Sequence, residues 1–306
     1  ERAITLCEGL VRQHKEPEHA LRLAEALHSK GKHLSALGDE QAAWRCCDTA
    51  MAHCRRVGGW RYYEPAEVLE ARAALSKARS LLALGSGTCA WHSVGRAQGV
   101  LERLVNWEGR WDLAEELATC HLIGGHASVR VRNNVRALRE FDRAIALLEP
   151  MVQLEERRHL ALSLVSAVAG KADAIRGMAD STEAPPTYRR AIALLEPLAA
   201  EGEPGATDYL LGCYLSLAGI LEHWRKLADS LDAYNHAVDL LEWMVSEEGL
   251  DDRRGNLAYA RIRRANVRQM MRDRDGARAE AREAIPILEQ EAARTGRSDL
   301  SVDCQN

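Results

Sequence analysis

Several features that mark particular protein classes are missing from this sequence of 306 residues. It contains no run of about 18 apolar residues, and its first segment does not pass from basic to apolar residues, so neither a membrane span nor a secretory signal is predicted. The eight cysteines form no CxxC pair, which favours reduced thiols in a cytoplasmic protein. Glycine-rich phosphate-binding loops of the GxGxxG or P-loop type do not occur either.

Strong charge of one sign and strand-like patterning are also absent. The formal net charge is only -4, which offers no general attraction to nucleic acid or to an anionic membrane, so neither is an expected partner. No long stretch alternates apolar and polar residues, and the chain has a single phenylalanine. Its 46% of hydrophobic residues are rich in alanine and leucine, which predicts closely packed helices.

An internal repeat organises this helical pattern. Residues 141–150 (FDRAIALLEP) and residues 188–197 (YRRAIALLEP) are nearly identical. The same register places alanines 47, 47, 47, 47, 46 and 47 residues apart along the chain, at Ala3, Ala50, Ala97, Ala144, Ala191, Ala237 and Ala284. A register of this length predicts a helix that recurs in every repeat, which we name helix B.

Small residues at fixed distances from these alanines carry a family resemblance. Seven residues before them stand Ala43, Ala90, Ala137, Ala184, Ser230 and Ala277, and nineteen residues before them, in a preceding helix A, stand Gly31, Ala78, Gly125, Ala172, Ala218 and Ala265. Larger side chains such as Phe141 and Tyr188 lie between the small positions of helix B. This spacing resembles the helical hairpin of the tetratricopeptide repeat (TPR) family. The resemblance implies that helices A and B cross at the small residues while the larger side chain fills the gap.

The resemblance predicts an all-α fold, a right-handed α-solenoid of antiparallel helix hairpins. The period of about 47 residues is longer than the family's period of about 34, and it also fits HEAT-type repeats, which are the alternative fold. Longer helices account for the extra length. Glycines at Gly38 and Gly85 are expected to end the first two A helices as C-caps.

The register predicts one repeat array over residues 1–306. Its expected elements are a lone helix at 1–14, hairpins at about 19–57, 64–106, 112–150, 156–200, 206–247 and 253–294, and the opening of another repeat at 297–306. The incomplete repeats at both ends predict an excerpt from a longer protein. Pro185 and Pro186 predict a late helix start capped near Ser181 or Thr182, and Pro286 predicts a kink or an early stop.

Candidate catalytic and metal-binding patterns are weak. Six thiol and imidazole groups on one hairpin are candidate zinc ligands: His28, His33, Cys46, Cys47, His53 and Cys54. They lack the short ligand spacings of structural zinc sites, and Cys47 takes the core position that Phe141 holds in another repeat. The segment 121–126 begins and ends with histidine but is not HExxH, and the turn 85–89 follows a helix rather than the strand of a nucleophile elbow. We therefore expect no enzyme activity, no metal and no cofactor.

Two further patterns each have two interpretations. Trp60 and Trp107 lie one period apart, as do Trp44 and Trp91, which favours buried indoles that staple the connections over a ligand-stacking site. A second group, Arg261, Arg264 and Arg268, shares one helix face. That face is either an exposed basic stripe for a partner or a face salt-bridged to Glu280 or Glu283.

The A helices supply the candidate binding site, because in stacked hairpins they line a concave groove. Equivalent positions form one largely apolar row and one basic row. The candidate groove residues are His28, Lys32, Arg72, Leu75, Arg79, Leu122, His126, Arg130, Arg176 and Leu215. We expect an acidic segment seated by Leu75, Leu122 and Leu215 and oriented by Lys32, Arg79 and Arg130. The alternative is that the apolar row packs neighbouring A helices together and the charges form a solvated face.

These expectations favour a scaffold that binds a protein or a peptide. One alternative is a regulatory or sensor segment of a larger signalling or protease-type protein, because TPR-like arrays often accompany such effector domains. Another is a structural subunit of a multi-protein complex, which predicts a broad apolar surface on the convex side. Nothing in the sequence identifies the partner or the oligomeric state.

Overall fold

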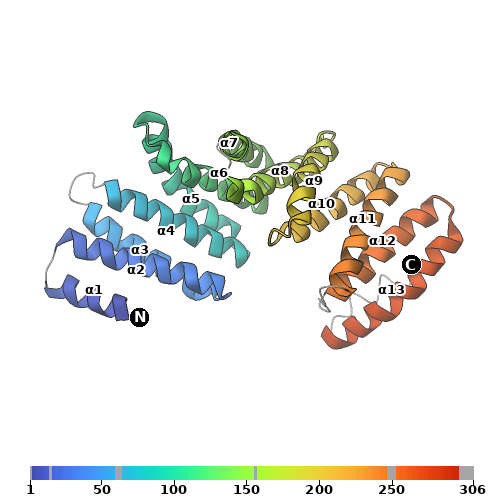
Figure 1. Ribbon diagram of the computed structural model, residues 1–306, viewed down its shortest axis with the longest axis horizontal. Helices are drawn as coiled ribbons and strands as arrows, with labels where there is room; N and C mark the ends of the chain where they lie inside the picture. Colours follow the sequence, from blue (N-terminus) through green and yellow to red (C-terminus); the bar gives the residue numbers. More distant parts are fainter. Residues whose placement is uncertain (1, 14–15, 59–63, 155–156, 247–252, 296–306) are drawn as a thin grey trace. The chain divides into compact units, whose positions relative to one another are not determined.

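The computed structural model describes residues 2–13, 16–58, 64–154, 157–246 and 253–295. This part of the chain forms thirteen α-helices and no strand, which confirms the predicted all-α, helical-repeat fold (Figure 1). No helix within it is long and apolar enough to cross a membrane. The chain divides into two compact units, Glu1–Ala179 and Asp180–Asn306. This boundary falls inside the expected hairpin 156–200, so the organisation as one array stays a prediction.

Unit 1 contains eight α-helices in the described ranges: α1 (Arg2–Gln13), α2 (Pro17–Ala36), α3 (Glu40–Gly58), α4 (Glu64–Ala83), α5 (Gly87–Glu102), α6 (Ala114–Arg130), α7 (Asn134–Gln153) and α8 (Ala161–Arg176). Each helix packs against the next one along the chain. The A helices α2, α4, α6 and α8 also contact one another in succession. One surface of unit 1 is therefore made of A helices, which we name the A face.

Three of the four A helices of unit 1, α2, α4 and α6, are followed by a residue with left-handed backbone. Gly38 and Gly85 have φ of 83° and 79°, and their amides donate to carbonyls three residues earlier, as expected for C-cap glycines. Arg132 occupies the next position in the series with φ of 58°, although a side chain disfavours this conformation. The tight turn from α6 to α7 therefore forms without the glycine that marks the earlier turns.

In the core of unit 1, one large ring packs against two glycines. Phe141 of α7 is 0% exposed and lies between Gly125 of α6 and Gly170 of α8. A Cβ atom on Gly125 would lie 2.6 Å from the ring, and one on Gly170 would lie 2.5 Å from it. No side chain fits at such distances. The prediction that a large residue of helix B fills the space left by a small residue of helix A is confirmed here.

Unit 2 contains five helices in the described ranges: α9 (Ala184–Ala200), α10 (Ala206–His223), α11 (Leu227–Ser246), α12 (Arg254–Met270) and α13 (Arg274–Thr295). As predicted, α9 starts late: its N-cap is Glu183, directly after Thr182, and Pro185 lies in its first turn, where the missing N–H costs nothing. The early stop expected at Pro286 is wrong, because α13 continues to Thr295. Residues 297–306, expected to open another repeat, lie outside the described residues.

Ala172 of α8 and Ala218 of α10 provide a test of this close packing, because both are 0% exposed. We expect Ala172→Leu or Ala218→Leu to lower the free energy of unfolding by about 1–3 kcal/mol through overpacking. Ala169→Leu is the matched control, since Ala169 lies one turn earlier on α8 and is half-buried. Urea denaturation would measure all three variants. Equal stability of Ala172→Leu and Ala169→Leu would contradict the assigned contact positions.

Candidate partner-binding surfaces

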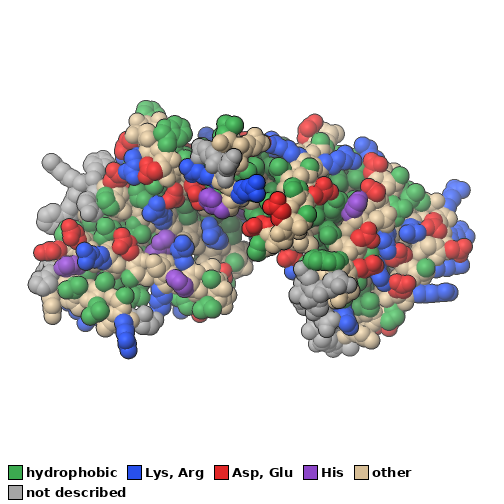
Figure 2. Space-filling view, viewed as in Figure 1, with side chains coloured by type: hydrophobic (Ala, Val, Ile, Leu, Met, Phe, Trp, Pro, Cys, Tyr) green, Lys and Arg blue, Asp and Glu red, His purple; other side chains and the backbone are tan. Residues whose placement is uncertain are grey.

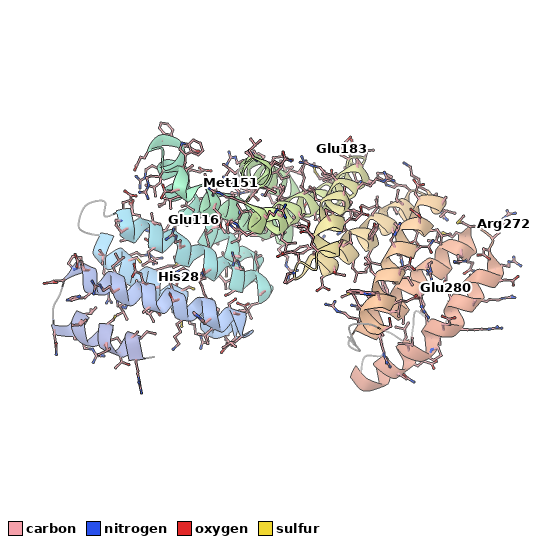
Figure 3. The ribbon with its side chains drawn as sticks, in the orientation of Figure 1. His28, Glu116, Met151, Glu183, Arg272 and Glu280 are labelled. Carbon is pink, nitrogen blue, oxygen red and sulfur yellow. The ribbon has the colours of Figure 1, made fainter. Side chains whose placement is uncertain are left out.

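The A face of unit 1 is held together by polar contacts between neighbouring A helices. The His28 Nε2 of α2 lies 2.9 Å from Ser76 Oγ of α4, and the His126 Nε2 of α6 lies 3.1 Å from Ser166 Oγ of α8. His28 and Glu116 are labelled in Figure 3, and Figure 2 shows histidine, basic and acidic side chains side by side on this part of unit 1. These contacts join α2 to α4 and α6 to α8.

Arg72 makes the contact between α4 and α6. Its Nε and Nη2 donate to Glu116 Oε1 at 2.9 and 2.5 Å. Burial, with a further contribution from the positive charges of Lys32 and Arg72, lowers the pKa of His28 to about 4. Burial also lowers the pKa of His126. The two imidazoles are therefore neutral at physiological pH and can donate or accept a hydrogen bond without adding charge.

The positive charge of the A face comes from exposed side chains one turn beyond these contacts. Three of them have no ion-pair partner among the described residues: Lys32, Arg79 and Arg130. Lys32 follows His28 by four residues, Arg79 follows Ser76 by three, and Arg130 follows His126 by four, so each shares a helix face with a bridging residue. These three cations are the ones that the sequence assigned to orienting an acidic ligand.

The other candidate groove residues are buried, half-buried or already paired. Leu75 is only 4% exposed, so its expected role as an open apolar anchor is wrong, and the alternative of packing inside the fold holds at this position. Leu122 is half-buried on the A face. Arg176 donates to Asp173 at 2.9 Å on its own helix, so its charge is already paired. Leu215 is half-buried in unit 2. The exposed character of the A face is therefore polar and basic rather than apolar.

His121 belongs to a buried hydrogen-bonded pair and not to a catalytic motif. Its Nδ1 lies 2.8 Å from Glu140 Oε2 of α7, and the two residues are 3% and 4% exposed. Arg136 lies 3.4 Å from the other oxygen of this carboxylate. Cys47 is a core residue as expected, since it packs where a Cβ on Gly31 would be 2.8 Å from its sulfur, and burial raises its pKa to about 12. Neither side chain is available for nucleophilic chemistry.

Tryptophans mark a second surface of unit 1. The expectation that Trp107 is a buried staple is wrong, because its side chain is 86% exposed, and Trp60 lies outside the described residues. Trp44 and Trp91 are half-buried, with Lys77 and Arg136 placed 5.6 and 4.8 Å from their ring centres. Trp44 and Trp91 therefore share one kind of environment, whereas Trp107 is open to solvent.

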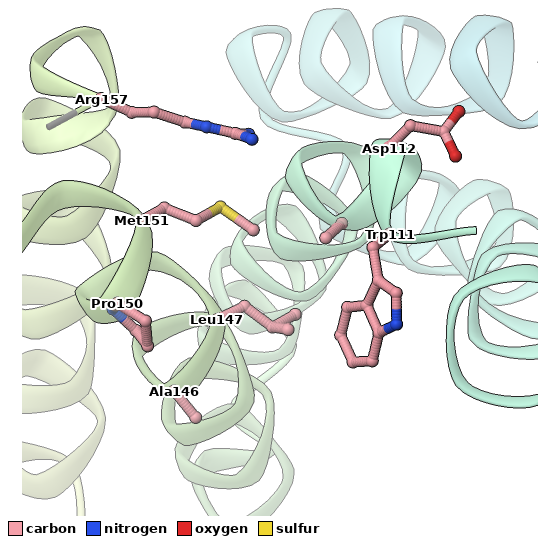
Figure 4. Close-up of a pocket in the computed structure, with 8 residues that line it drawn as sticks. Trp111, Asp112, Ala146, Leu147, Pro150, Met151 and Arg157 are labelled. Carbon is pink, nitrogen blue, oxygen red and sulfur yellow. The ribbon is translucent and has the colours of Figure 1, made fainter. Parts of the chain in front are cut away.

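A cavity of about 430 Å³ lies close to the exposed connection between α5 and α6 (Figure 4). Its walls are Trp111 on one side and Leu147, Pro150 and Met151 of α7 on the other, with Arg157 at its edge. Trp111 is 64% exposed. Sequence reasoning missed this site, because Trp111 has no counterpart in other repeats and the wall from α7 lies about 40 residues away along the chain.

Comparison with solved structures assigns this architecture. The fold is that of TPR-like helical-repeat proteins. The nuclear import adaptor Nro1 from S. pombe superposes with a TM-score of 0.58 at 16% identity, over 95% of this chain and 99% of that chain. A Rap protein complexed with competence and sporulation factor matches with a TM-score of 0.52 at 12% identity, over 93% of this chain and 79% of that chain.

A third TPR-like structure is longer than this chain. It is a signal transduction ATPase with numerous domains (STAND) from Pyrococcus horikoshii that carries a TPR sensor, with a TM-score of 0.58 at 12% identity. The match covers 95% of this chain and 43% of the STAND protein. No protein-family model matches the sequence, and no curated protein matches it.

In unit 2 of this TPR-like fold, the arginine stripe of α12 is an internal ion-pair network. Arg264 pairs with Glu280 of α13 at 2.5 Å, and Arg261 pairs with Glu283 at 2.5 Å. Glu280 is labelled in Figure 3. Arg268 donates to Asp273 at 3.1 Å. Of the two interpretations of this stripe, the salt-bridged face is confirmed, and these charges are not offered to a partner.

Proposed function

We propose that the protein is a binding scaffold whose A face takes an acidic segment of a partner protein or a peptide. The observation that carries this proposal is that three exposed cations on successive A helices, Lys32, Arg79 and Arg130, have no ion-pair partner among the described residues. Elsewhere on unit 1 many basic groups are already paired, as Arg55 is with Glu70 at 2.8 Å. Unpaired charge held on rigid helices is pre-organised for an anionic ligand.

The arrangement of the A face suggests how such a segment binds. Packed helices lie about 8–10 Å apart, so neighbouring A helices offer one contact for roughly every three residues of an extended chain. Lys32, Arg79 and Arg130 stand on three successive A helices and would each meet a carboxylate. The neutral His126 and the half-buried Leu122 lie near Arg130 on the same helix and supply a hydrogen-bonding group and an apolar contact.

The structural comparisons are consistent with this use of the fold. The matching Rap structure is a complex with competence and sporulation factor, and Nro1 is described as a nuclear import adaptor. At identities of 12% and 16%, these matches support the fold, and the binding role of the present chain rests on its own side chains.

Charge reversal tests the proposal. We expect the double variant Arg79→Glu and Arg130→Glu to weaken binding of acidic peptides by at least about tenfold and to flatten its salt dependence. The probe is a fluorescent library of ten-residue peptides rich in Asp, Glu and Leu, measured by anisotropy between low and physiological salt. The matched control is Arg45→Glu with Arg139→Glu, which makes the same charge change on exposed positions of α3 and α7. Equal affinity and salt dependence of both double variants would refute an electrostatic A face.

A second candidate function is that of a structural subunit, and the exposed tryptophans favour it. Trp107, Trp111 and Leu154 are 86%, 64% and 81% exposed, and large apolar side chains of this kind mark an interaction site where they form one patch. Assembly with a partner through this surface would be lost in Trp107→Ala with Trp111→Ala and would be insensitive to salt. A complex that survives this variant but not the arginine reversal would favour the scaffold.

A further inference from the structure

A cavity of about 320 Å³ in unit 2 lies between the B helices α9 and α11, over α10. Its floor is apolar: Leu217 and Leu221 of α10 are 5% and 1% exposed, and Ile192 of α9 is 7% exposed. The volume is at the lower end of ligand pockets, and it matches one long side chain rather than a cofactor. All of its lining residues belong to unit 2, so the cavity is separate from the A face.

One wall of this cavity is a stacked pair of rings. The centres of Tyr214 and His236 are 4.9 Å apart with an interplanar angle of 20°. Tyr214 is 8% exposed, whereas His236 is exposed, so the imidazole is the ring that an incoming group meets. The Tyr214 hydroxyl donates to Glu196 Oε1 at 3.0 Å, which holds this carboxylate beside the rings. Burial, together with Glu196 and Asp232, raises the pKa of Tyr214 to about 12, so the phenol remains a donor.

The rim of the cavity is acidic. Glu196, Asp229 and Asp232 line it as exposed carboxylates, and Arg189 is the one guanidinium among its lining residues. Three negative charges against one positive charge leave a net charge of -2 around the opening. Arg189 lies 3.7 Å from Asp229, and Asp232 has no ion-pair partner within the described ranges. The cavity therefore combines an apolar floor, a flat ring and uncompensated carboxylates.

We propose that this cavity binds the side chain of an arginine presented by a partner protein segment. The planar guanidinium would stack on His236 and donate to the carboxylates of Glu196 and Asp232, while its methylene groups would cover Leu217 and Leu221. Arginine fits better than lysine, because an ammonium group is a compact point charge that gains less from a flat ring and from paired acceptors. This cavity would therefore bind a cationic group, whereas the ligand proposed for the A face is acidic. The inference does not depend on the proposed function.

A set of matched peptides tests this assignment on the full chain. The probes are Ac-Ala-Ala-Arg-Ala-Ala-amide and the same peptide with lysine or with citrulline, which keeps the shape of arginine but not its charge. Methyl NMR of leucine-labelled protein would follow the signals of Leu217 and Leu221. We expect saturable shifts of these two signals with the arginine peptide, weaker binding with lysine, and no binding with citrulline.

Two conservative variants complete the test. Glu196→Gln with Asp232→Asn should raise the Kd of the arginine peptide at least about tenfold, whereas Asp239→Asn, an exposed position of α11 outside the cavity, should leave it unchanged. Thermal melts would show that the variants are folded. The proposal is wrong if the citrulline or lysine peptide binds as tightly as the arginine peptide. It is also wrong if the Kd is unchanged in the double variant, or if the NMR shifts are confined to other leucines. If free arginine binds as tightly as the peptide, the claim that the arginine belongs to a partner protein segment is wrong.

Discussion

Replacement of Phe141 by alanine is expected to lower the free energy of unfolding by about 3–5 kcal/mol, which is the usual cost of removing a fully buried phenyl ring. The ring is 0% exposed and fills the space between Gly125 on α6 and Gly170 on α8. Because neither glycine has a side chain that can move into the cavity, little of the loss can be recovered by collapse. Urea denaturation followed by circular dichroism would measure the change.

Gly125→Ala provides the matched counterpart to this experiment. The new Cβ would lie 2.6 Å from the Phe141 ring, so the single variant should be overpacked and destabilised by about 1–3 kcal/mol. Combining it with Phe141→Leu removes the clash, and the double variant should be more stable than the sum of the single changes predicts. Strict additivity of Gly125→Ala and Phe141→Leu would contradict a direct contact between the two positions.

Removal of one partner from the His121–Glu140 pair should have a comparably large effect. Both residues are almost fully buried, and Glu140→Leu would leave the imidazole without its acceptor at a cost of about 3–5 kcal/mol. Replacing both partners by leucine removes the unsatisfied group, so the double variant should be more stable than Glu140→Leu alone. Denaturation of the two variants measures this difference. A double variant less stable than Glu140→Leu and less stable than His121→Leu would show that the loss of other contacts outweighs the removal of the unsatisfied group.

The same pair predicts a dependence of stability on pH. Burial alone would raise the pKa of Glu140. The hydrogen bond with His121 and the nearby charges of His121, Arg136 and Arg143 outweigh burial, so the pKa of Glu140 lies below its usual value of 4.5. A carboxyl group with a lowered pKa stabilises the folded state above its unfolded pKa, and that contribution is lost as the pH falls through the folded pKa. Unfolding measured below about pH 4.5 should therefore show a smaller loss of stability in Glu140→Gln than in the unmodified protein.

Local and periodic properties of this protein were readable from the sequence. Helices, their small contact positions and the capping glycines depend on residues a few positions apart, so the spacing of Gly125, Phe141 and Ala144 was enough to predict a helical repeat with close crossings. The spacing of Arg261, Arg264 and Arg268 likewise showed that they share one face. Arg132 was missed, because a left-handed turn residue without glycine carries no local signal.

The tertiary structure alone decided which side chains are open and which are already paired. Leu75 and Leu122 are equivalent in the repeat, yet the first is buried and the second half-exposed, and Trp107 is exposed where a buried ring was expected. Arg72 and Arg79 lie two turns apart on α4, but only Arg72 meets a carboxylate, from Glu116 on the next A helix. These outcomes depend on contacts between segments about 40 residues apart. A periodic pattern specifies the face of a helix, whereas burial and charge pairing depend on what the neighbouring helices place against that face.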